Sequence, residues 1–266
     1  GIGVETVRIA VPRPCELTIK GSDRDDIAIQ TQTTARGSTQ AEAKAAADAA
    51  TLKADTKADV IAPTGLWDDR RGPAGYITQA TVTILLPRRL TVRLQPHIGA
   101  LNVSNVAALE SLSSRGETHV IDTAGAVQLT HISGTLEIRG AAGLKLNARN
   151  SRGEISGVSG TTSIETIGGR LKLSGLSGTL EIESRNSDLT LEKITGLTPP
   201  LRYNGTGGEL RIDGLRTEAR IDGRNTDMTI ALDAPAPVTI YNLGAIVVTA
   251  PPGGYTPATK AKATSV

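Results

Sequence analysis

The sequence predicts an all-β fold, a parallel β-helix or β-solenoid with rungs of about 18 residues. Glycines recur between Gly125 and Gly196 at spacings close to nine residues. Short runs that alternate apolar and polar residues follow most of them, as in Leu136-Glu-Ile138. The chain of 266 residues has no Phe, one Trp and one Met, so its core must be aliphatic. A thin aliphatic core suits rungs that pack only on their neighbours.

Several segments near the start are expected to be strands. Residues 4–12 and 15–33 alternate apolar and polar side chains with a period of two, with turn-forming residues between them. Tyr76–Leu86 and Leu90–Leu94 show the same alternation. The loop before Tyr76 holds Trp67 beside four charged residues; we expect a hairpin loop with the indole folded over its base.

An alanine-rich segment interrupts these strands and predicts one helix over residues 40–53. Thr39 and Glu42 fit a capping box, and Lys44 and Asp48 have the spacing of a helical ion pair. Alanine has the highest helix propensity. Because the apolar face is mostly alanine, we expect this helix to cap or flank the solenoid.

The repeat begins near Ile98 and contains two kinds of unit. One kind follows a Ser/Thr-Gly turn, and the other follows a plainer Gly, Asn or Ser turn such as Ala142-Gly143, Gly168-Gly169 or Asn186-Ser187. The turns of the first kind are Ile132-Ser-Gly134, Val158-Ser-Gly160, Leu176-Ser-Gly178 and Ile194-Thr-Gly196. One unit of each kind makes a rung with two strands and two turns. Leu136, Leu173 and Ile182 are expected inside, and Glu137, Lys172 and Glu181 outside.

Three regions follow from this pattern. Residues 1–97 are expected to hold N-terminal strands and the helical insert, packed on or capping the solenoid. Residues 98–255 are the solenoid repeats, and residues 256–266 are a tail or a truncated final rung. Asn147, Asn150, Asn186, Asn204 and Asn225 recur at turns, where we expect them to supply hydrogen bonds and left-handed conformations.

Composition and motifs indicate no enzyme. The charges, 29 basic and 27 acidic residues, are mixed along the chain, and a stripe of basic and stacking aromatic residues for nucleic acid is missing. Cys15 is expected to be a buried, inert thiol, and the three histidines are expected at the surface or in turns. Asp213 and Asp222 form a carboxylate pair only if their rungs bring them together, and we interpret both as turn residues. We therefore expect no catalytic residues, no cofactor and no metal.

The order of parts resembles a known family, the DUF4097-like adhesin domains of bacteria. The resemblance rests on Leu17-Thr-Ile-Lys-Gly21, on Ile84-Leu-Leu-Pro87, and on the tandem motifs Ser133-Gly-Thr-Leu-Glu-Ile138 and Ser177-Gly-Thr-Leu-Glu-Ile182. It covers about residues 5–262. It implies a β-solenoid, export to the periplasm or cell surface, attachment to a membrane only through an anchor outside this sequence, and no established catalytic residues.

These observations lead to one main functional expectation and two alternatives. We expect a non-enzymatic envelope protein that binds a partner protein or a cell-wall polymer. The candidate binding residues are Glu137, Arg139, Lys172, Glu181 and Glu183 on a strand face, and Trp67, Asp68 and Arg70 in the loop. The first alternative is a structural subunit that associates end to end, because open solenoid ends expose backbone edges. The second, a polysaccharide-active enzyme, is disfavoured by the scarcity of aromatic residues and clustered carboxylates.

Overall fold

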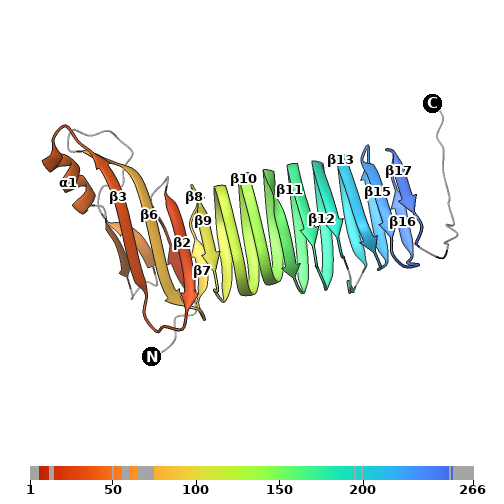
Figure 1. The fold of residues 1–266 in the computed structure, drawn as a ribbon, viewed down its shortest axis with the longest axis horizontal. Helices are drawn as coiled ribbons and strands as arrows, with labels where there is room; N and C mark the ends of the chain where they lie inside the picture. Colours follow the sequence, from red (N-terminus) through yellow and green to blue (C-terminus); the bar gives the residue numbers. More distant parts are fainter. Residues whose placement is uncertain are drawn as a thin grey trace.

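The chain forms a long rod in which strands stack side by side (Figure 1). The computed structural model describes residues 6–11, 15–49, 51–55, 60–64, 75–194, 196–198, 200–251 and 253. Within these ranges it contains one helix and one continuous 17-stranded sheet. The fold is a parallel β-solenoid, as predicted, and it has about nine turns.

The first nine strands are β1 (Thr6–Ile9), β2 (Glu16–Ser22), β3 (Ala28–Arg36), β4 (Thr51–Asp55), β5 (Val60–Thr64), β6 (Tyr76–Pro87), β7 (Thr91–Leu94), β8 (His97–Ile98) and β9 (Leu101–Ser104). The remaining strands are β10 (Ala108–Val158), β11 (Thr161–Ser174), β12 (Thr179–Glu192), β13 (Leu201–Leu215), β14 (Ala219–Arg224), β15 (Asp227–Leu232), β16 (Val238–Tyr241) and β17 (Ile246–Thr249). Helix α1 spans Gln40–Ala49.

Parallel pairing in register defines the rungs. Leu144 in β10 pairs with Thr162 in β11, and Thr162 pairs with Leu180 in β12, so these rungs are about 18 residues apart. The step is slightly shorter near the start of the repeat, where β7 pairs with β10, and longer where β12 pairs with β13. The central prediction of the sequence, parallel coils of near-equal length, is confirmed.

Each rung contributes two strands, one on either side of a narrow core. Leu136, Leu173 and Ile182 are almost completely buried, as expected. We name the outer side of the strands that carry Lys145, Ser163, Glu181, Arg202 and Arg220 face A. The outer side of the strands that carry Glu154, Lys172, Thr190, Arg211 and Thr229 is face B.

The predicted alternation of turns is wrong at one rung. Ile132-Ser-Gly134 leads into a face B strand, because Leu136 lies beside Gly153, whose partner is Leu171. The other three Ser/Thr-Gly turns precede face A strands. The two corner types therefore exchange places between Gly134 and Gly160. Irregular glycine spacings of ten and seven residues mark this exchange in the sequence.

Tight corners between face A and face B need left-handed backbone. Asn150, Asn186 and Asn225 have φ values of 50°, 50° and 54°, which confirms the expected role of these three asparagines. Asn147 and Asn204 lie in face A strands instead, so their assignment to turns was wrong. Gly168 sits between Asn150 and Asn186, and a Cβ there would lie 2.6 Å from the Asn150 side-chain oxygen. Asparagine and glycine thus alternate because the asparagine amide occupies space that only glycine leaves free.

The N-terminal region adds further parallel strands to the stack, and antiparallel strands and the helix then cover that end of the rod. Strand β1 pairs in parallel with β7, and β2 pairs with β9 and β6. Beyond them, β3 runs antiparallel to β6, and β4 runs antiparallel to β5. Helix α1 contacts β3 and β6 and lies at this end of the rod (Figure 1). The proposed boundary near residue 97 stays a prediction.

The helix is shorter than predicted. It ends at Ala49 instead of residue 53, because residues 51–55 form β4 and pair with β5. Strand pairing here overrides the helix propensity of alanine and lysine. The start is as predicted. The Thr39 amide donates to Glu42 and the Glu42 amide donates to the Thr39 hydroxyl, while Lys44 and Asp48 pair at 2.7 Å.

Candidate functional site

The structure divides the predicted binding residues between two surfaces. Glu137, Arg139 and Lys172 lie on face B, whereas Glu181 and Glu183 lie on face A. The core separates these groups, so they do not form one contiguous site. Trp67, Asp68 and Arg70 lie outside the described residues, as does the predicted tail at 256–266.

Charged side chains on the faces pair along and between rungs. On face B, Arg170 contacts Asp188 of the next rung at 3.2 Å, and Lys172 contacts Glu192 at 3.0 Å. On face A, Arg220 pairs with Asp222 at 3.1 Å. Such exposed pairs each contribute little to stability, but they hold side chains in repeating positions.

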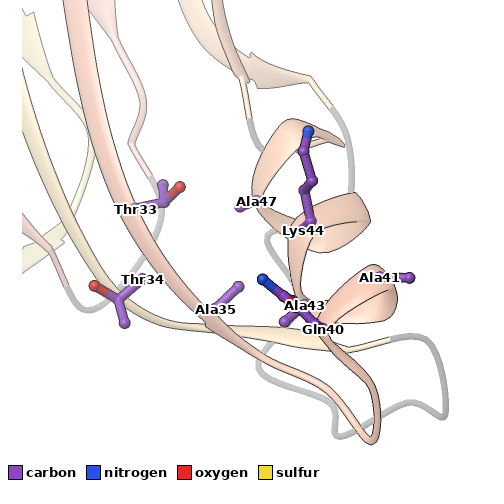
Figure 2. Close-up of a pocket in the computed structure, with 8 residues that line it drawn as sticks. All are labelled: Thr33, Thr34, Ala35, Gln40, Ala41, Ala43, Lys44 and Ala47. Atoms are coloured by element: carbon purple, nitrogen blue, oxygen red, sulfur yellow. The ribbon is translucent and has the colours of Figure 1, made fainter.

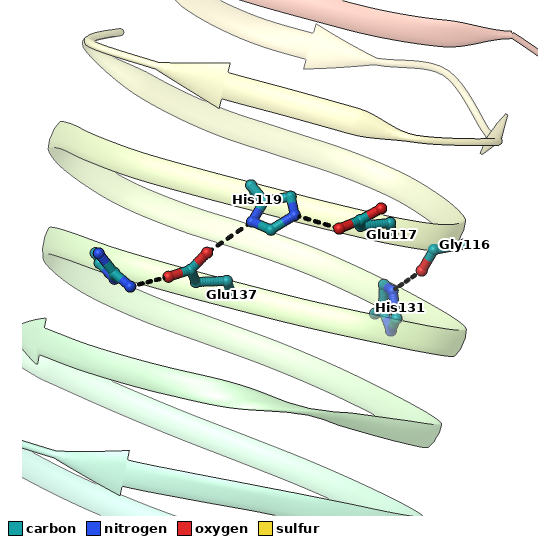
Figure 3. A network of polar contacts seen from close by, with 6 residues as sticks. Gly116, Glu117, His119, His131 and Glu137 are labelled. Carbon is teal, nitrogen blue, oxygen red and sulfur yellow. Dashed lines mark hydrogen bonds and ion pairs between the residues drawn. The ribbon is translucent and has the colours of Figure 1, made fainter.

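A histidine on face B links two rungs through two carboxylates. The Nε2 atom of His119 lies 2.9 Å from Glu117, and its Nδ1 atom lies 2.7 Å from Glu137 of the next rung (Figure 3). Arg139 contacts the other oxygen of Glu137. The hydrogen bond to Glu117, followed by that to Glu137, raises the pKa of His119 despite partial burial. The protonated ring donates from both nitrogens.

Two histidines are buried, which corrects the expectation that all three lie at the surface or in turns. His131 and His97 are 0% and 1% exposed. The Nδ1 atom of His131 lies 2.7 Å from the Ser151 hydroxyl, and Nε2 lies 3.2 Å from the Gly116 carbonyl (Figure 3). Burial lowers the pKa of His131. The neutral ring can donate from Nε2 and accept at Nδ1.

These residues belong to a polar column inside the core, beside the corners between the two faces. Its members are small or polar and include Ser114, Ser151, Thr166, Ser184, Ser187 and Thr226. Tyr203 is 2% exposed, and burial raises its pKa, countered in part by the Ser184 and Thr226 hydroxyls. A Cβ at Gly205 would lie 2.1 Å from the Tyr203 hydroxyl oxygen. Tyr203 is therefore a core residue and offers no platform for a sugar ring.

The carboxylates considered for catalysis lie apart. Asp222 stands on face A opposite Asn204, whereas Asp213 stands on face B opposite Glu192. Asp213 precedes a corner at Gly214, where φ is 77°, as expected for a turn residue. Asp222 is followed by Gly223, which does not have a positive φ, and the corner falls later, at Asn225, so the assignment of Asp222 to a turn was wrong.

Other reactive groups are enclosed or dispersed. Cys15 is buried, as expected, and burial, followed by the nearby charge of Glu16, raises its pKa to about 12. Within the described ranges, no group of three or more His, Cys, Asp or Glu side chains is arranged to hold a metal ion.

A shallow hollow lies between β3 and α1 (Figure 2). Alanine and threonine side chains form most of its wall, together with Gln40 and Lys44. Lys44 already pairs with Asp48. The hollow therefore presents one neutral amide and no unpaired charge to a ligand.

Sequence reasoning missed a set of arginines at the corners. Arg115, Arg149, Arg185 and Arg224 each stand immediately before a corner residue, Gly116 or an asparagine. They are far apart in the chain, so no basic block is visible. The signal that could have found them is the dipeptide Arg-Asn, which recurs at residues 149, 185 and 224.

Comparison with known proteins gives no match among family models, curated proteins or solved structures. In the described part of the chain, no helix has the length and apolar character that crossing a bilayer requires. The fold is thus established as a β-solenoid with repeating rungs, without a family assignment.

Proposed function

We propose that this chain is a non-enzymatic protein of the cell envelope or surface, exported to the periplasm or beyond, whose solenoid is a binding or scaffold surface. Its resemblance to the DUF4097-like adhesin domains suggested this role. The structural observation that carries it is the fixed repetition of polar side chains along two strand faces. Parallel pairing in register holds Glu154, Lys172 and Thr190 in one line on face B.

A rigid face of this kind favours a partner with its own repeat. Side chains in one line are separated by the strand spacing of about 4.8 Å. Each exposed ion pair or hydrogen bond adds little, so affinity must come from several contacts made together. A cell-wall polymer or a protein with an extended surface can make them; a small ligand cannot.

The test is co-sedimentation of the purified chain with isolated cell envelopes. The amount bound is compared between the wild-type chain and two double variants, each of which counts as one set. Glu137→Gln with Lys172→Gln alters face B, and Glu181→Gln with Glu183→Gln alters face A. Binding by the wild-type chain and at least a fivefold loss in one set supports the proposal. The same residual binding in both sets, or no envelope binding by the wild-type chain, contradicts it. Fractionation of the native cells tests export separately.

Self-association is a second candidate, favoured by the C-terminal end of the rod. Large apolar side chains are exposed on this last described rung: Tyr241, Leu243, Ile246, Val247 and Val248. The opposite end is closed by antiparallel β3 and by α1, which opposes stacking of one copy's C-terminal end onto another copy's N-terminal end. Two C-terminal ends remain able to pair, with β17 edges adding to each other.

Sedimentation velocity across a concentration series tests this second candidate. A dimer that Val247→Lys abolishes supports pairing of C-terminal ends. A monomer at all concentrations, or a dimer that Val247→Lys leaves intact, contradicts it. The control is Thr190→Lys, which changes an outward residue on face B. A core residue such as Val92 would not serve, because a lysine there would disrupt the fold itself.

A further inference from the structure

One edge of the solenoid carries arginine at every second rung. The strand registers place Arg115 beside Ile98, and place Arg149, Ile167, Arg185, Thr206 and Arg224 in one continuous line. From the burial pattern we assign Ile132 to the same line, because it follows buried His131 as Arg115 follows buried Ser114 and Arg149 follows buried Ala148. We call this line, from Ile98 to Arg224, the arginine edge.

The arginines of this edge are exposed and available. Arg115, Arg149, Arg185 and Arg224 are all exposed. Within the described part of the chain, none of them forms an ion pair, in contrast to Arg170, Arg211 and Arg220 on the faces. Four guanidinium groups therefore point outward along the rod without acidic partners.

Spacing along the edge follows from the strand spacing. Adjacent rungs are about 4.8 Å apart, so arginines on alternate rungs are separated by about 10 Å and the whole set spans about 29 Å. Isoleucine or threonine stands between them. Ile132 and Ile167 are partly exposed, and Ile98 is 39% exposed. The edge thus alternates a cation with an uncharged side chain that is mostly apolar.

Neighbouring charges offset part of this positive charge, and the offset differs along the edge. Beyond the corner on face B, Arg152 adds positive charge near the middle of the edge, whereas Arg170 and Asp188 pair and offset each other. Acidic residues flank the edge on face A, at Glu165, Glu183 and Asp222, and on face B, at Glu209 and Asp227. Glu165 accepts a hydrogen bond from Asn147. The most positive stretch is therefore Arg149 to Arg185.

We propose that the arginine edge binds a linear acidic polysaccharide with one carboxylate on every second sugar. Guanidinium groups bind carboxylates through two parallel hydrogen bonds, and the intervening isoleucines offer an apolar surface to the C–H face of an uncharged sugar. The edge is a surface distinct from faces A and B, and the inference holds whether or not those faces bind a partner.

A nucleic acid fits this edge less well. Every nucleotide carries a phosphate, so successive phosphates lie closer together than the arginines, and some of them would lie over isoleucine instead of arginine. Proteins that bind single strands also stack bases on aromatic side chains. No described residue of the edge is aromatic, and the nearby Tyr203 is buried. Nucleic acid binding is therefore an outcome that would contradict the proposal.

The experiment uses the full chain and polymers of defined charge spacing. The probes are hyaluronan fragments, which carry one uronate per disaccharide, polygalacturonate, which carries one on every sugar, neutral dextran, and a single-stranded oligonucleotide. Because each exposed contact is weak, affinity must rise with the number engaged. We expect a hyaluronan decasaccharide to bind at low salt at least tenfold more tightly than a tetrasaccharide, and binding to weaken as salt is raised.

Two matched variants locate the site. The edge variant carries Arg115→Gln, Arg149→Gln, Arg185→Gln and Arg224→Gln. The control carries Arg93→Gln, Arg139→Gln, Arg211→Gln and Arg220→Gln, so it has the same net charge. We expect the edge variant to lose at least tenfold in hyaluronan affinity and the control to lose less than threefold. If the edge variant does not fold, the pair Arg149→Gln and Arg185→Gln replaces it.

A third variant tests the alternation itself. Ile132→Arg with Ile167→Arg places arginine on successive rungs, which should raise affinity for polygalacturonate relative to hyaluronan. Absence of hyaluronan binding at low salt, equal losses in the edge and control variants, no change of preference in the third variant, or tighter binding of the oligonucleotide overturns the proposal.

Discussion

Glu137 and Glu181 occupy the same place in two copies of the hexapeptide Ser-Gly-Thr-Leu-Glu-Ile, yet they point outward from opposite sides of the core. Glu137 lies between His119 and Arg139 on face B. Glu181 stands on face A, where its register partners are Ser163 and Arg202. Identical local sequence therefore specifies the strand and its inward residues, while the length of the intervening turns decides which face it joins.

Close stacking of rungs should make one glycine far less replaceable than another. At Gly169, φ is 95° and a Cβ would lie 2.1 Å from the Ser151 carbonyl oxygen. At Gly175, φ is 59° and the nearest atom would lie 3.8 Å away. Gly169→Ala should cost about 3 kcal/mol or more, and Gly175→Ala about 1 kcal/mol. Guanidinium unfolding measures both, and equal costs would contradict the stacking described.

The His119 network should stabilise the fold under mildly acidic conditions. Its pKa is raised in the folded state, so its contribution is fully present below the unfolded value of about 6.5 and is lost as pH rises through the folded pKa. His119→Gln should therefore cost more at pH 5.5 than at pH 8.5, by up to about 1 kcal/mol because the ring is partly exposed. A larger cost at pH 8.5 would show that the network does not favour the imidazolium.

His131 should have the opposite pH dependence. Burial lowers the pKa of His131 in the folded state. Below about pH 6.5 the imidazole is therefore protonated in the unfolded chain but stays neutral in the folded chain. The free energy of unfolding falls as pH decreases toward the folded pKa. His131→Asn removes this loss, so the stability gap between wild type and variant should narrow from pH 7.5 to pH 5. Urea unfolding at both pH values measures the gap; a gap that widens on acidification would disprove the account of this residue.

The only cysteine should be unreactive while the chain is folded. Burial raises the pKa of Cys15 to about 12, so almost no thiolate is present at pH 8. A disulfide reagent should label it only after unfolding. Cys15→Ala with Lys172→Cys provides an exposed control thiol on face B, which should react within the mixing time. Labelling of folded Cys15 at the control's rate would contradict its burial.

Much of the fold could be predicted because its signal is local and repeated. Inward Leu173 and outward Lys172 follow directly from the period-two alternation within one rung. Whether a given strand lies on face A or face B could not be predicted. It depends on the number of residues in each corner, which changes from rung to rung. The end of α1 was also missed, because β4 forms through antiparallel pairing with β5, which no local pattern indicates.

The candidate sites depended still more on the fold. Arg115 and Arg224 lie far apart in the chain, and only the rung length brings them to one edge. His131 was expected in a turn or at the surface because no carboxylate or thiol accompanied it in the sequence to form a metal site. Its position opposite Ser151 and Gly116 is a product of rung stacking. The sequence spacing predicts which residues lie side by side on neighbouring rungs only if the length of every rung is known.

Two disulfide-trapping variants test the parallel solenoid most directly. In a Cys15→Ala background, Lys172→Cys with Thr190→Cys joins register partners on adjacent rungs, about 4.8 Å apart and within disulfide reach. Lys172→Cys with Glu181→Cys joins residues closer in sequence that lie on opposite faces. Mild oxidation should give an intrachain disulfide in the first variant and free thiols in the second. A disulfide in the second variant and none in the first would indicate an antiparallel hairpin and contradict the fold.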